Sequence, residues 1–248
     1  MDLSGRVMAI TGATSGIGEA TAIMAARAGA AVALAGRRAD RLEDVAARIE
    51  DEGGRALAVP TDVTVEDEAR AFVQQAYEHL GRLDVLVNNA GVMLLGPVMG
   101  ADTSEWRRMI EVNCLGLLWC THAALAVMGE QRAGHIVNVS SVAGRRAWLG
   151  AAVYNMTKFG VTAFSEALRQ EALHFGVRVT AIEPGFVDTE LQGHNEGKEA
   201  VMDATEKMRA RIGRVLSADD VAASILYAVS QPQHVNVAEV LIVPRGER

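Results

Sequence analysis

A tyrosine and a lysine four residues apart, Tyr154 and Lys158, are the side chains in this sequence best suited to move a proton. Residues four apart lie on one face of a helix, so both groups can act on the same molecule. A tyrosine has an ordinary pKa of about 10 and is a poor base near neutral pH. A neighbouring ammonium stabilises the phenolate and lowers that pKa. The pair therefore predicts acid–base chemistry at an alcohol or carbonyl oxygen, with Tyr154 exchanging the proton.

A glycine-rich turn near the N-terminus predicts a binding place for phosphate groups. It reads TGATSGIG over residues 11–18, between a predicted strand and a predicted helix. Glycine lets the backbone approach a pyrophosphate, and the helix start offers free N–H groups and the positive end of its dipole. An ordinary strand-to-helix turn is the alternative, because glycines mark such turns as well.

The end of the second predicted strand indicates which dinucleotide would bind. Folds that prefer NAD usually place an acid there to bind the ribose 2′-hydroxyl. This strand instead ends in Gly36-Arg37-Arg38, and a guanidinium can bind a phosphate through two parallel hydrogen bonds. We therefore predict NADP(H) as the cofactor, bound first by Arg37 with support from Arg38. Two solvated arginines at the start of a helix are the alternative.

Short apolar segments alternate with longer helical segments and must position these residues. The predicted strands cover residues 6–11, 31–35, 55–59, 83–87, 135–139, 178–182 and 240–243, and the predicted helices cover 16–28, 39–52, 65–80, 104–128, 152–175 and 218–229. Nearly continuous apolar runs are typical of strands buried on both faces. The alternation predicts an α/β fold, a single doubly wound parallel sheet of about seven strands with helices on both faces, Rossmann-like.

No linker divides the chain, so we expect residues 1–248 to form one dinucleotide-binding and catalytic domain. The polar segment 185–214 follows a strand and carries many charges. It is expected to be a substrate lid, with a solvated surface loop as the alternative. Asp102, Thr103 and Ser104 can cap the fourth helix, and Ser217 can cap the last.

The order and spacing of several motifs resemble the short-chain dehydrogenase/reductase family over essentially the whole chain. The motifs are the glycine-rich turn, Asn88-Asn89-Ala90-Gly91, Asn113, Ser141 thirteen residues before Tyr154, the Tyr154-x-x-x-Lys158 pair and Pro184-Gly185. Within the family, residues 88–97 resemble the clavulanate dehydrogenases. The tail from Asp219 to Asn236 resembles the NADP-dependent 3-hydroxy acid (serine-type) dehydrogenases.

The resemblance implies a catalytic group of Ser141, Tyr154, Lys158 and Asn113. Ser141 would bind the substrate oxygen and stabilise its developing charge, while the adjacent Ser140 turns to the other side. Lys158 would bind the nicotinamide ribose. Asn113 would kink its helix and hold a water near the lysine, whereas a solvated mid-helix asparagine is the alternative.

The resemblance also implies a cofactor-binding set. It comprises Gly12, Thr14, Ser15, Gly16, Ile17, Gly18, Arg37, Arg38, Asp62, Val63, Asn89, Ala90, Gly91, Tyr154, Lys158, Pro184, Gly185, Val187 and Thr189. Asp62 and Val63 would contact the adenine, although Asp62 could equally cap a helix. Thr189, together with the backbone of Val187, would bind the carboxamide.

The expected substrate-facing residues are mostly apolar, which fits a small secondary alcohol or carbonyl compound. They are Ser141, Tyr154, Met93, Arg145, Trp148 and Phe186, with Leu94, Ala143, Arg146, Leu149, Leu191 and His194 as further candidates. A hydroxy acid or a clavulanate-like compound is the finer expectation, with Arg145 or Arg146 on a carboxylate. Two arginines at the surface or in a subunit interface are the alternative.

Two rival functions share the fold. A 3-oxoacyl-carrier-protein reductase would need a basic rim around the pocket mouth, because acyl-carrier proteins are acidic. A non-catalytic NADP(H)-binding sensor would not need Ser141, Tyr154 and Lys158, and their presence argues against it.

Composition and charge exclude several other classes. A formal net charge of −7 disfavours nucleic acid as a partner. The six histidines form no metal-binding pattern, and Cys114 and Cys120 lie too far apart on a helix for a disulfide, which favours the reducing cytoplasm. No signal peptide is visible, and the longest apolar stretch, residues 114–128, is shorter than a membrane span. The resemblance implies a homodimer or homotetramer through the fourth and fifth helices, whose apolar residues could instead pack on the sheet.

Overall fold

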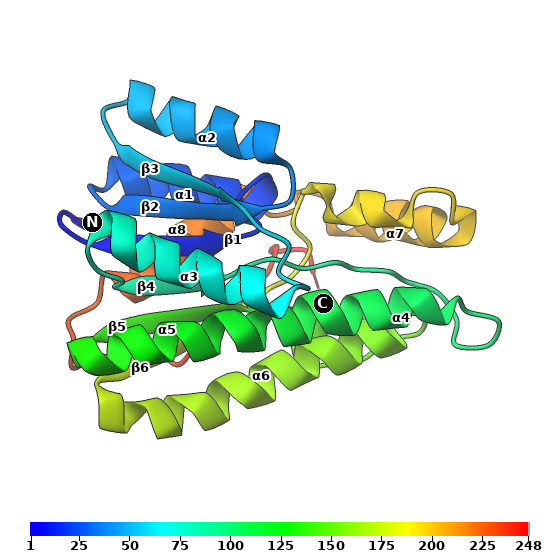
Figure 1. Ribbon diagram of the computed structural model, residues 1–248. Helices are drawn as coiled ribbons and strands as arrows, with labels where there is room; N and C mark the ends of the chain where they lie inside the picture. The colour runs from blue at the N-terminus through cyan, green and yellow to red at the C-terminus, as the bar shows by residue number, and fades with distance from the viewer. Residues whose placement is uncertain (248) are drawn as a thin grey trace.

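The computed structural model describes residues 1–247 and contains one seven-stranded sheet (Figure 1). The strands are β1 (Val7–Thr11), β2 (Ala31–Gly36), β3 (Arg55–Pro60), β4 (Val85–Asn88), β5 (Gly134–Val139), β6 (Val177–Pro184) and β7 (Glu239–Ile242). Their order is β3-β2-β1-β4-β5-β6-β7, and every neighbouring pair is parallel. The predicted Rossmann-like fold is confirmed.

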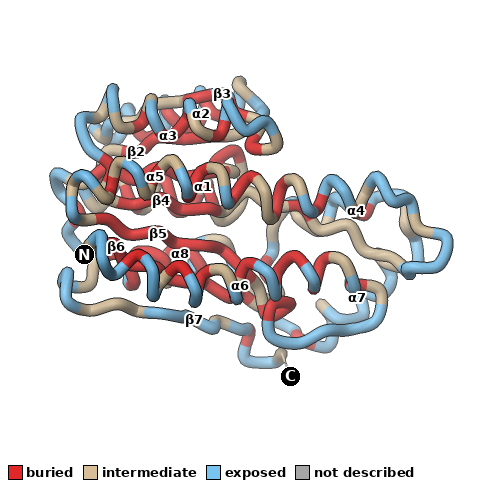
Figure 2. The backbone as a smooth tube through the Cα atoms, turned by 60° about the horizontal axis from the view of Figure 1, so that its bottom comes forward, coloured by how far each residue is buried: buried red, intermediate tan, exposed pale blue. Residues whose placement is uncertain are grey.

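Helices cover both faces of the sheet, which is why the strands are apolar almost throughout. One face carries α1 (Gly16–Arg27), α2 (Ala39–Asp51) and α8 (Ala218–Val229); the other carries α3 (Glu66–Leu80), α4 (Thr103–Ile110), α5 (Leu117–Gln131) and α6 (Ala152–Ala172). Each face has its own apolar core, around Leu34 and Ile225 on the first and around Phe72 and Met128 on the second. Figure 2 shows the buried backbone concentrated in the strands and along the inward sides of these helices.

The predicted helix over residues 104–128 is instead three consecutive segments. A π-helical segment, η1 (Glu111–Gly116), separates α4 from α5. A π-helical turn shifts the backbone bonding from i→i+4 to i→i+5 and is frequent at functional sites. Periodicity could not reveal it, because one wider turn barely changes the apolar spacing. The segment contains Asn113.

The helical run over residues 103–131 is long and apolar enough to cross a membrane by length and composition alone. A core helix of a folded domain passes the same test, so this finding does not overturn the expectation drawn from residues 114–128. Here the run packs along β4 and β5 and against α3.

The strand order reverses between β1 and β4, and a ligand crevice forms outside the carboxyl ends of the strands at such a point. Gly12 follows β1 and Asn89 follows β4, so both sit at this crevice. The segment 185–214, shown in yellow in Figure 1, contains a 3₁₀ segment, η4 (Glu190–Asn195), and a helix, α7 (Glu199–Ile212). Helix α7 is not predicted by the sequence pattern, because its many charges and the flanking Gly197 and Gly213 resemble a polar loop.

Two predicted helix caps are present. The Asp102 carboxylate accepts the Ser104 N–H at the start of α4. Ser217 and Asp220 exchange hydrogen bonds at the start of α8 and form a capping box.

Candidate active site

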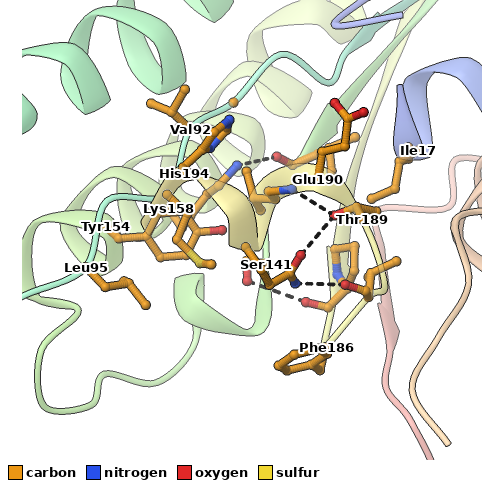
Figure 3. Close-up of a pocket in the computed structure, with 18 of the residues that line it drawn as sticks. Ile17, Val92, Leu95, Ser141, Tyr154, Lys158, Phe186, Thr189, Glu190 and His194 are labelled. Atoms are coloured by element: carbon orange, nitrogen blue, oxygen red, sulfur yellow. Dashed lines mark hydrogen bonds between the residues drawn. The ribbon is translucent and has the colours of Figure 1, made fainter. Parts of the chain in front are cut away.

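A cavity of about 1080 Å³ lies at the carboxyl ends of the strands, between the glycine-rich turn and the segment 185–214. It gathers nearly all of the predicted site residues, and in Figure 3 Tyr154, Lys158 and Ser141 lie around the same space as Ile17, Thr189 and Phe186. Five candidates do not line it: Gly18, Leu94, Asn113, Ala143 and Arg145. The cavity therefore brings together motifs that are far apart in the sequence.

Tyr154 and Lys158 come from the first turns of α6 and are both buried. The Lys158 Nζ lies 6.0 Å from the centroid of the Tyr154 ring and donates a hydrogen bond to the Val139 carbonyl at 2.8 Å. That bond anchors the lysine at the end of β5. It leaves the ammonium's other protons for a ligand in the cavity.

Burial is the main cause of the pKa shifts of Tyr154 and Lys158. It raises the pKa of Tyr154 to about 12, and a hydrogen bond with Ser141 acts in the lowering direction. Burial also lowers the pKa of Lys158 to about 8. The expectation that Lys158 lowers the tyrosine pKa is therefore not met in the protein by itself, because removing the phenolate from water costs more than the hydrogen bond with Ser141 returns.

The two neighbouring serines face different ways. The Ser140 hydroxyl is held by the Lys158 carbonyl and the Thr162 hydroxyl, on the body of α6. The Ser141 hydroxyl accepts the Ala143 N–H at 3.1 Å and donates to the Pro184 carbonyl at 3.4 Å, and it is the group that lowers the pKa of Tyr154. The predicted alternation is confirmed, and Ser141 is the serine beside the tyrosine.

Asn113 is buried and lies behind the cavity wall. Its amide accepts the Val92 N–H at 2.8 Å and donates to the Val92 carbonyl at 2.9 Å and to the Thr157 hydroxyl at 3.2 Å. The alternative of a solvated mid-helix asparagine is wrong. Asn113 fastens the chain after β4 to the π-helical segment, and its holding of a water stays a prediction.

The glycine-rich turn is braced by the chain after β4. Gly12 has a φ of +66°, and a Cβ there would lie 2.9 Å from the Ala90 Cα. A Cβ on Gly18 would lie 2.2 Å from the Gly12 carbonyl oxygen, so Gly18 supports the turn from behind. The Asn89 amide donates to the carbonyls of Thr11 and Gly12 at 3.0 and 3.1 Å. This packing, together with the uncapped start of α1 at Ser15, leaves the N–H groups of a helix terminus at the cavity.

The two arginines after β2 differ in their surroundings. Arg38 donates to the hydroxyls of Thr14 at 2.8 Å and Ser15 at 3.0 Å, and pairs with Glu190 at 2.9 Å. Arg37 is exposed and lines the cavity. Asp62 also lines the cavity and accepts both the N–H and the hydroxyl of Thr64. It closes a turn before α3 and does not cap that helix, whose N-cap is Val65, so the alternative of a helix cap is wrong and the adenine contact stays a prediction.

Thr189 and Val187 lie across the cavity from Tyr154. Thr189 packs on the glycine-rich turn, where a Cβ on Gly16 would come within 3.1 Å of its methyl group. The Val187 carbonyl accepts the Gln192 amide at 2.8 Å, which leaves less of that backbone for a carboxamide than predicted.

Arg145 is not a pocket residue, and this corrects its assignment. Its guanidinium pairs with Glu183, which is fully buried, and with Glu239 on β7. Arg145 therefore supplies the positive charge that the buried Glu183 carboxylate needs. Burial raises the pKa of Glu183, and the hydrogen bond and charge of Arg145 lower it. Arg146 does line the cavity, with Glu247 at 3.7 Å.

Three contributors to the cavity were missed. Glu190 follows Thr189, Glu247 comes from the C-terminal end of the described chain, and α7 supplies Val201, Met208 and Ile212. Glu247 accepts the Phe186 N–H at 2.8 Å. Glu247 lies far along the sequence from the motifs and offers no local signal, and Glu190, although adjacent to Thr189, reaches its arginine partners only through folding.

Metal ligands do not gather anywhere in residues 1–247: no group of three or more His, Cys, Asp or Glu could hold an ion there. Cys114 and Cys120 are both free, as predicted.

Comparisons with known proteins agree with this geometry. The family model described as short chain dehydrogenase matches residues 6–200. A glycine betaine reductase, ATRR, of Emericella nidulans is 42% identical over 245 residues; the match covers 99% of this chain but only 19% of that protein. An uncharacterized oxidoreductase of Staphylococcus saprophyticus is 39% identical over 245 residues, covering 98% of this chain and 97% of the relative.

A solved structure, the closed form of serine dehydrogenase complexed with NADP⁺, superposes with a TM-score of 0.89. It is 31% identical and covers 98% of this chain and 96% of its own. The predicted likeness to serine-type dehydrogenases is thereby confirmed, whereas the likeness to clavulanate dehydrogenases stays a prediction.

Proposed function

This chain belongs to the short-chain dehydrogenase family of oxidoreductases, and we propose that it transfers hydride between NADP(H) and a small secondary alcohol or carbonyl compound. The observation that carries the proposal is one cavity that holds Ser141, Tyr154 and Lys158 next to a glycine-rich turn flanked by two arginines. The NADP⁺ bound in the related serine dehydrogenase supports the choice of cofactor.

The residues at the glycine-rich turn fit a phosphorylated dinucleotide. A Cβ at Gly12 or Gly16 would intrude on Ala90 or Thr189, so glycine keeps a cradle open there. Arg37, Arg38 and the Ser15 hydroxyl supply donors for a 2′-phosphate, and the start of α1 supplies N–H groups for the pyrophosphate. Lys158 would hold the ribose and Thr189 the carboxamide.

The chain's own residues handle the proton. A bound nicotinamide supplies or accepts the hydride. Tyr154, whose raised pKa keeps its hydroxyl protonated, donates that proton to the oxygen of a carbonyl substrate. Ser141 donates a second hydrogen bond to the same oxygen and stabilises its developing charge. In the reverse reaction Tyr154 acts as the base that accepts the proton of the alcohol.

The substrate pocket supports a hydroxy acid or the corresponding oxo acid. Met93, Trp148 and Phe186 supply apolar walls, and Arg146 is the cation nearest Ser141 in sequence among those that line the cavity. We assign the carboxylate to Arg146, and a clavulanate-like compound is a bulkier version of the same chemistry. Arg146 must exchange its 3.7 Å contact with Glu247 for the substrate.

The test is NADP⁺ reduction with a matched panel of 3-hydroxy acids and neutral secondary alcohols, with NAD⁺ in parallel. We expect turnover of the acids with NADP⁺, and an increase of about fivefold in their KM in Arg146→Gln. The same change in Arg145→Gln should act on stability instead. Turnover of neutral alcohols alone would remove the carboxylate assignment and keep the oxidoreductase.

One observation favours a second candidate, a 3-oxoacyl-carrier-protein reductase. Three exposed arginines, Arg108, Arg146 and Arg211, line the cavity and supply the basic rim that an acidic carrier would need. Faster reduction of a carrier-bound 3-oxoacyl group than of the free acid would select it. A purely NADP(H)-binding sensor would show binding without any turnover.

We further propose a homodimer or homotetramer in the cytoplasm. Exposed apolar side chains on α4, α5 and α6, including Ile110, Leu118, Met156 and Phe159, offer a surface for a second copy. Sedimentation equilibrium would test the assembly. The two free cysteines support the reducing compartment.

A further inference from the structure

Glu190 carries a carboxylate from the segment 185–214 across to the start of α2. Its two oxygens pair with Arg38 at 2.9 Å and with Arg41 at 2.6 Å. Its side chain is about half exposed, so this is an accessible ion pair. Glu190 directly follows Thr189, which packs on Gly16 of the glycine-rich turn. Figure 3 shows Glu190 and Thr189 together on the cavity wall.

The same Arg38 guanidinium also contacts the glycine-rich turn. Its Nη2 donates to the Thr14 hydroxyl at 2.8 Å and to the Ser15 hydroxyl at 3.0 Å. The Glu190 carboxylate is therefore bound by a cation that the glycine-rich turn itself positions. An anion of the protein sits where the donors for a cofactor phosphate converge.

Glu190 also supplies the carboxylate that the end of β2 lacks. The end of β2 reads Gly36-Arg37-Arg38, without the acid that usually binds a free ribose 2′-hydroxyl. In the folded protein the Glu190 carboxylate lies at the end of β2, although Glu190 is about 150 positions further along the chain.

Resting on the proposed NADP(H) function, we infer that Glu190 is an internal anion that competes with the cofactor's 2′-phosphate for Arg38. NADP⁺ must exchange its phosphate for the carboxylate, whereas NAD⁺ leaves the ion pair in place. Glu190 thus lowers the discrimination between the two cofactors and ties the segment 185–214 to the cofactor site until the phosphate arrives. Hydrogen bonds from Arg41 and Arg38 lower the pKa of Glu190 to about 2, so the competition persists throughout the neutral range.

The test compares Glu190→Gln with Glu196→Gln by titration calorimetry against NADP⁺, NAD⁺ and adenosine 2′,5′-bisphosphate, which lacks the nicotinamide. Glu196 is a matched control, because it is an exposed acid six residues further on with no ion pair among residues 1–247. Glu190→Gln should bind NADP⁺ and the bisphosphate about threefold more tightly, as expected for an exposed ion pair. Its NAD⁺ affinity should be unchanged or weaker, and Glu196→Gln should match the unmodified chain.

Hydrogen exchange without cofactor gives a second readout. Residues 190–212 should exchange faster in Glu190→Gln than in Glu196→Gln. Unchanged or weaker NADP⁺ binding by Glu190→Gln would overturn the inference while the proposed function stands. If the unmodified chain binds neither dinucleotide, both fall.

Discussion

The two ends of the cavity are built by different means. At the cofactor end, formed by the glycine-rich turn and the chain after β4, the backbone itself is locked: a Cβ on Gly18 would lie 2.2 Å from the Gly12 carbonyl oxygen. At the substrate end, formed by residues 93–95 and the segment 185–214, side chains hold the parts together. Asn195 bonds to the Met93 carbonyl and the Leu95 N–H, and Lys198 pairs with Glu105.

This difference separates what the protein keeps constant from what it can vary. A phosphate cradle made of backbone tolerates almost no substitution. A pocket closed by a few polar side chains can change its substrate by exchanging them, with the sheet untouched. The predictions below test whether the two ends behave independently.

The largest effect is expected at Tyr154, where the two ends meet. Tyr154→Phe removes the proton donor, so kcat should fall by about 10³. The Kd for NADP⁺ should change by less than about twofold, since the phosphate contacts lie elsewhere. Stopped-flow turnover and calorimetry measure the two quantities. A variant retaining more than about a tenth of the turnover would remove Tyr154 from the chemistry.

The same substitution at both ends gives the next contrast. Gly18→Ala should destabilise the protein by about 3 kcal/mol and weaken NADP⁺ binding, because the added methyl meets backbone. Gly193→Ala, where a Cβ meets nothing within 4 Å, should stay within about 0.5 kcal/mol. Urea unfolding of the pair provides the measurement. Equal effects would refute the contrast between a locked and an exchangeable end.

Lys158→Met tests how far the site sacrifices stability for function. Burial lowers the folded-state pKa of Lys158 to about 8, so a charged lysine costs stability at pH 7. The variant should be inactive yet more stable by about 2 kcal/mol. Between pH 8 and 10.5 the folded lysine loses its proton before the unfolded one does, so the native chain gains stability and the variant's advantage shrinks. A constant difference in unfolding free energy between the variant and the unmodified chain across this pH range would contradict the lowered pKa of Lys158.

The smallest effect is expected from loosening the substrate end alone. Asn195→Ala leaves the Leu95 N–H and the Met93 carbonyl without their partner and should raise the substrate KM about fivefold. The Kd for NADP⁺ should stay within about twofold. Parallel steady-state kinetics and cofactor titration would measure both. A matching loss of cofactor affinity would mean that the two ends are mechanically coupled.

Local patterns were sufficient for most of the framework and for the Tyr154–Lys158 pair that we propose as catalytic. The apolar runs predicted all seven strands, and the caps Asp102 and Ser217 marked helix starts correctly. Strand alternation, together with the spacing of the family that the sequence resembles, selected Ser141 over Ser140. These features depend on residues close in sequence, so a single chain reports them.

Local patterns failed where the outcome depended on distant partners. Arg145 and Arg146 are adjacent and chemically identical, yet only folding turns the first onto Glu183 and Glu239 and the second toward the cavity. The π-helical segment contains Asn113, whose side chain bonds to Val92 and Thr157, and periodicity does not register such bonds to distant residues.

The sequence by itself determined the doubly wound sheet, the glycine-rich turn and the Tyr154–Lys158 pair, because periodicity, backbone freedom and i, i+4 spacing act over a few residues. Only the tertiary structure decided the raised pKa of Tyr154, the side of each arginine and the meeting of Glu190 with Arg38. Those properties arise from burial and from charges brought together by long-range packing. Neither can be inferred from residues that are neighbours in the sequence.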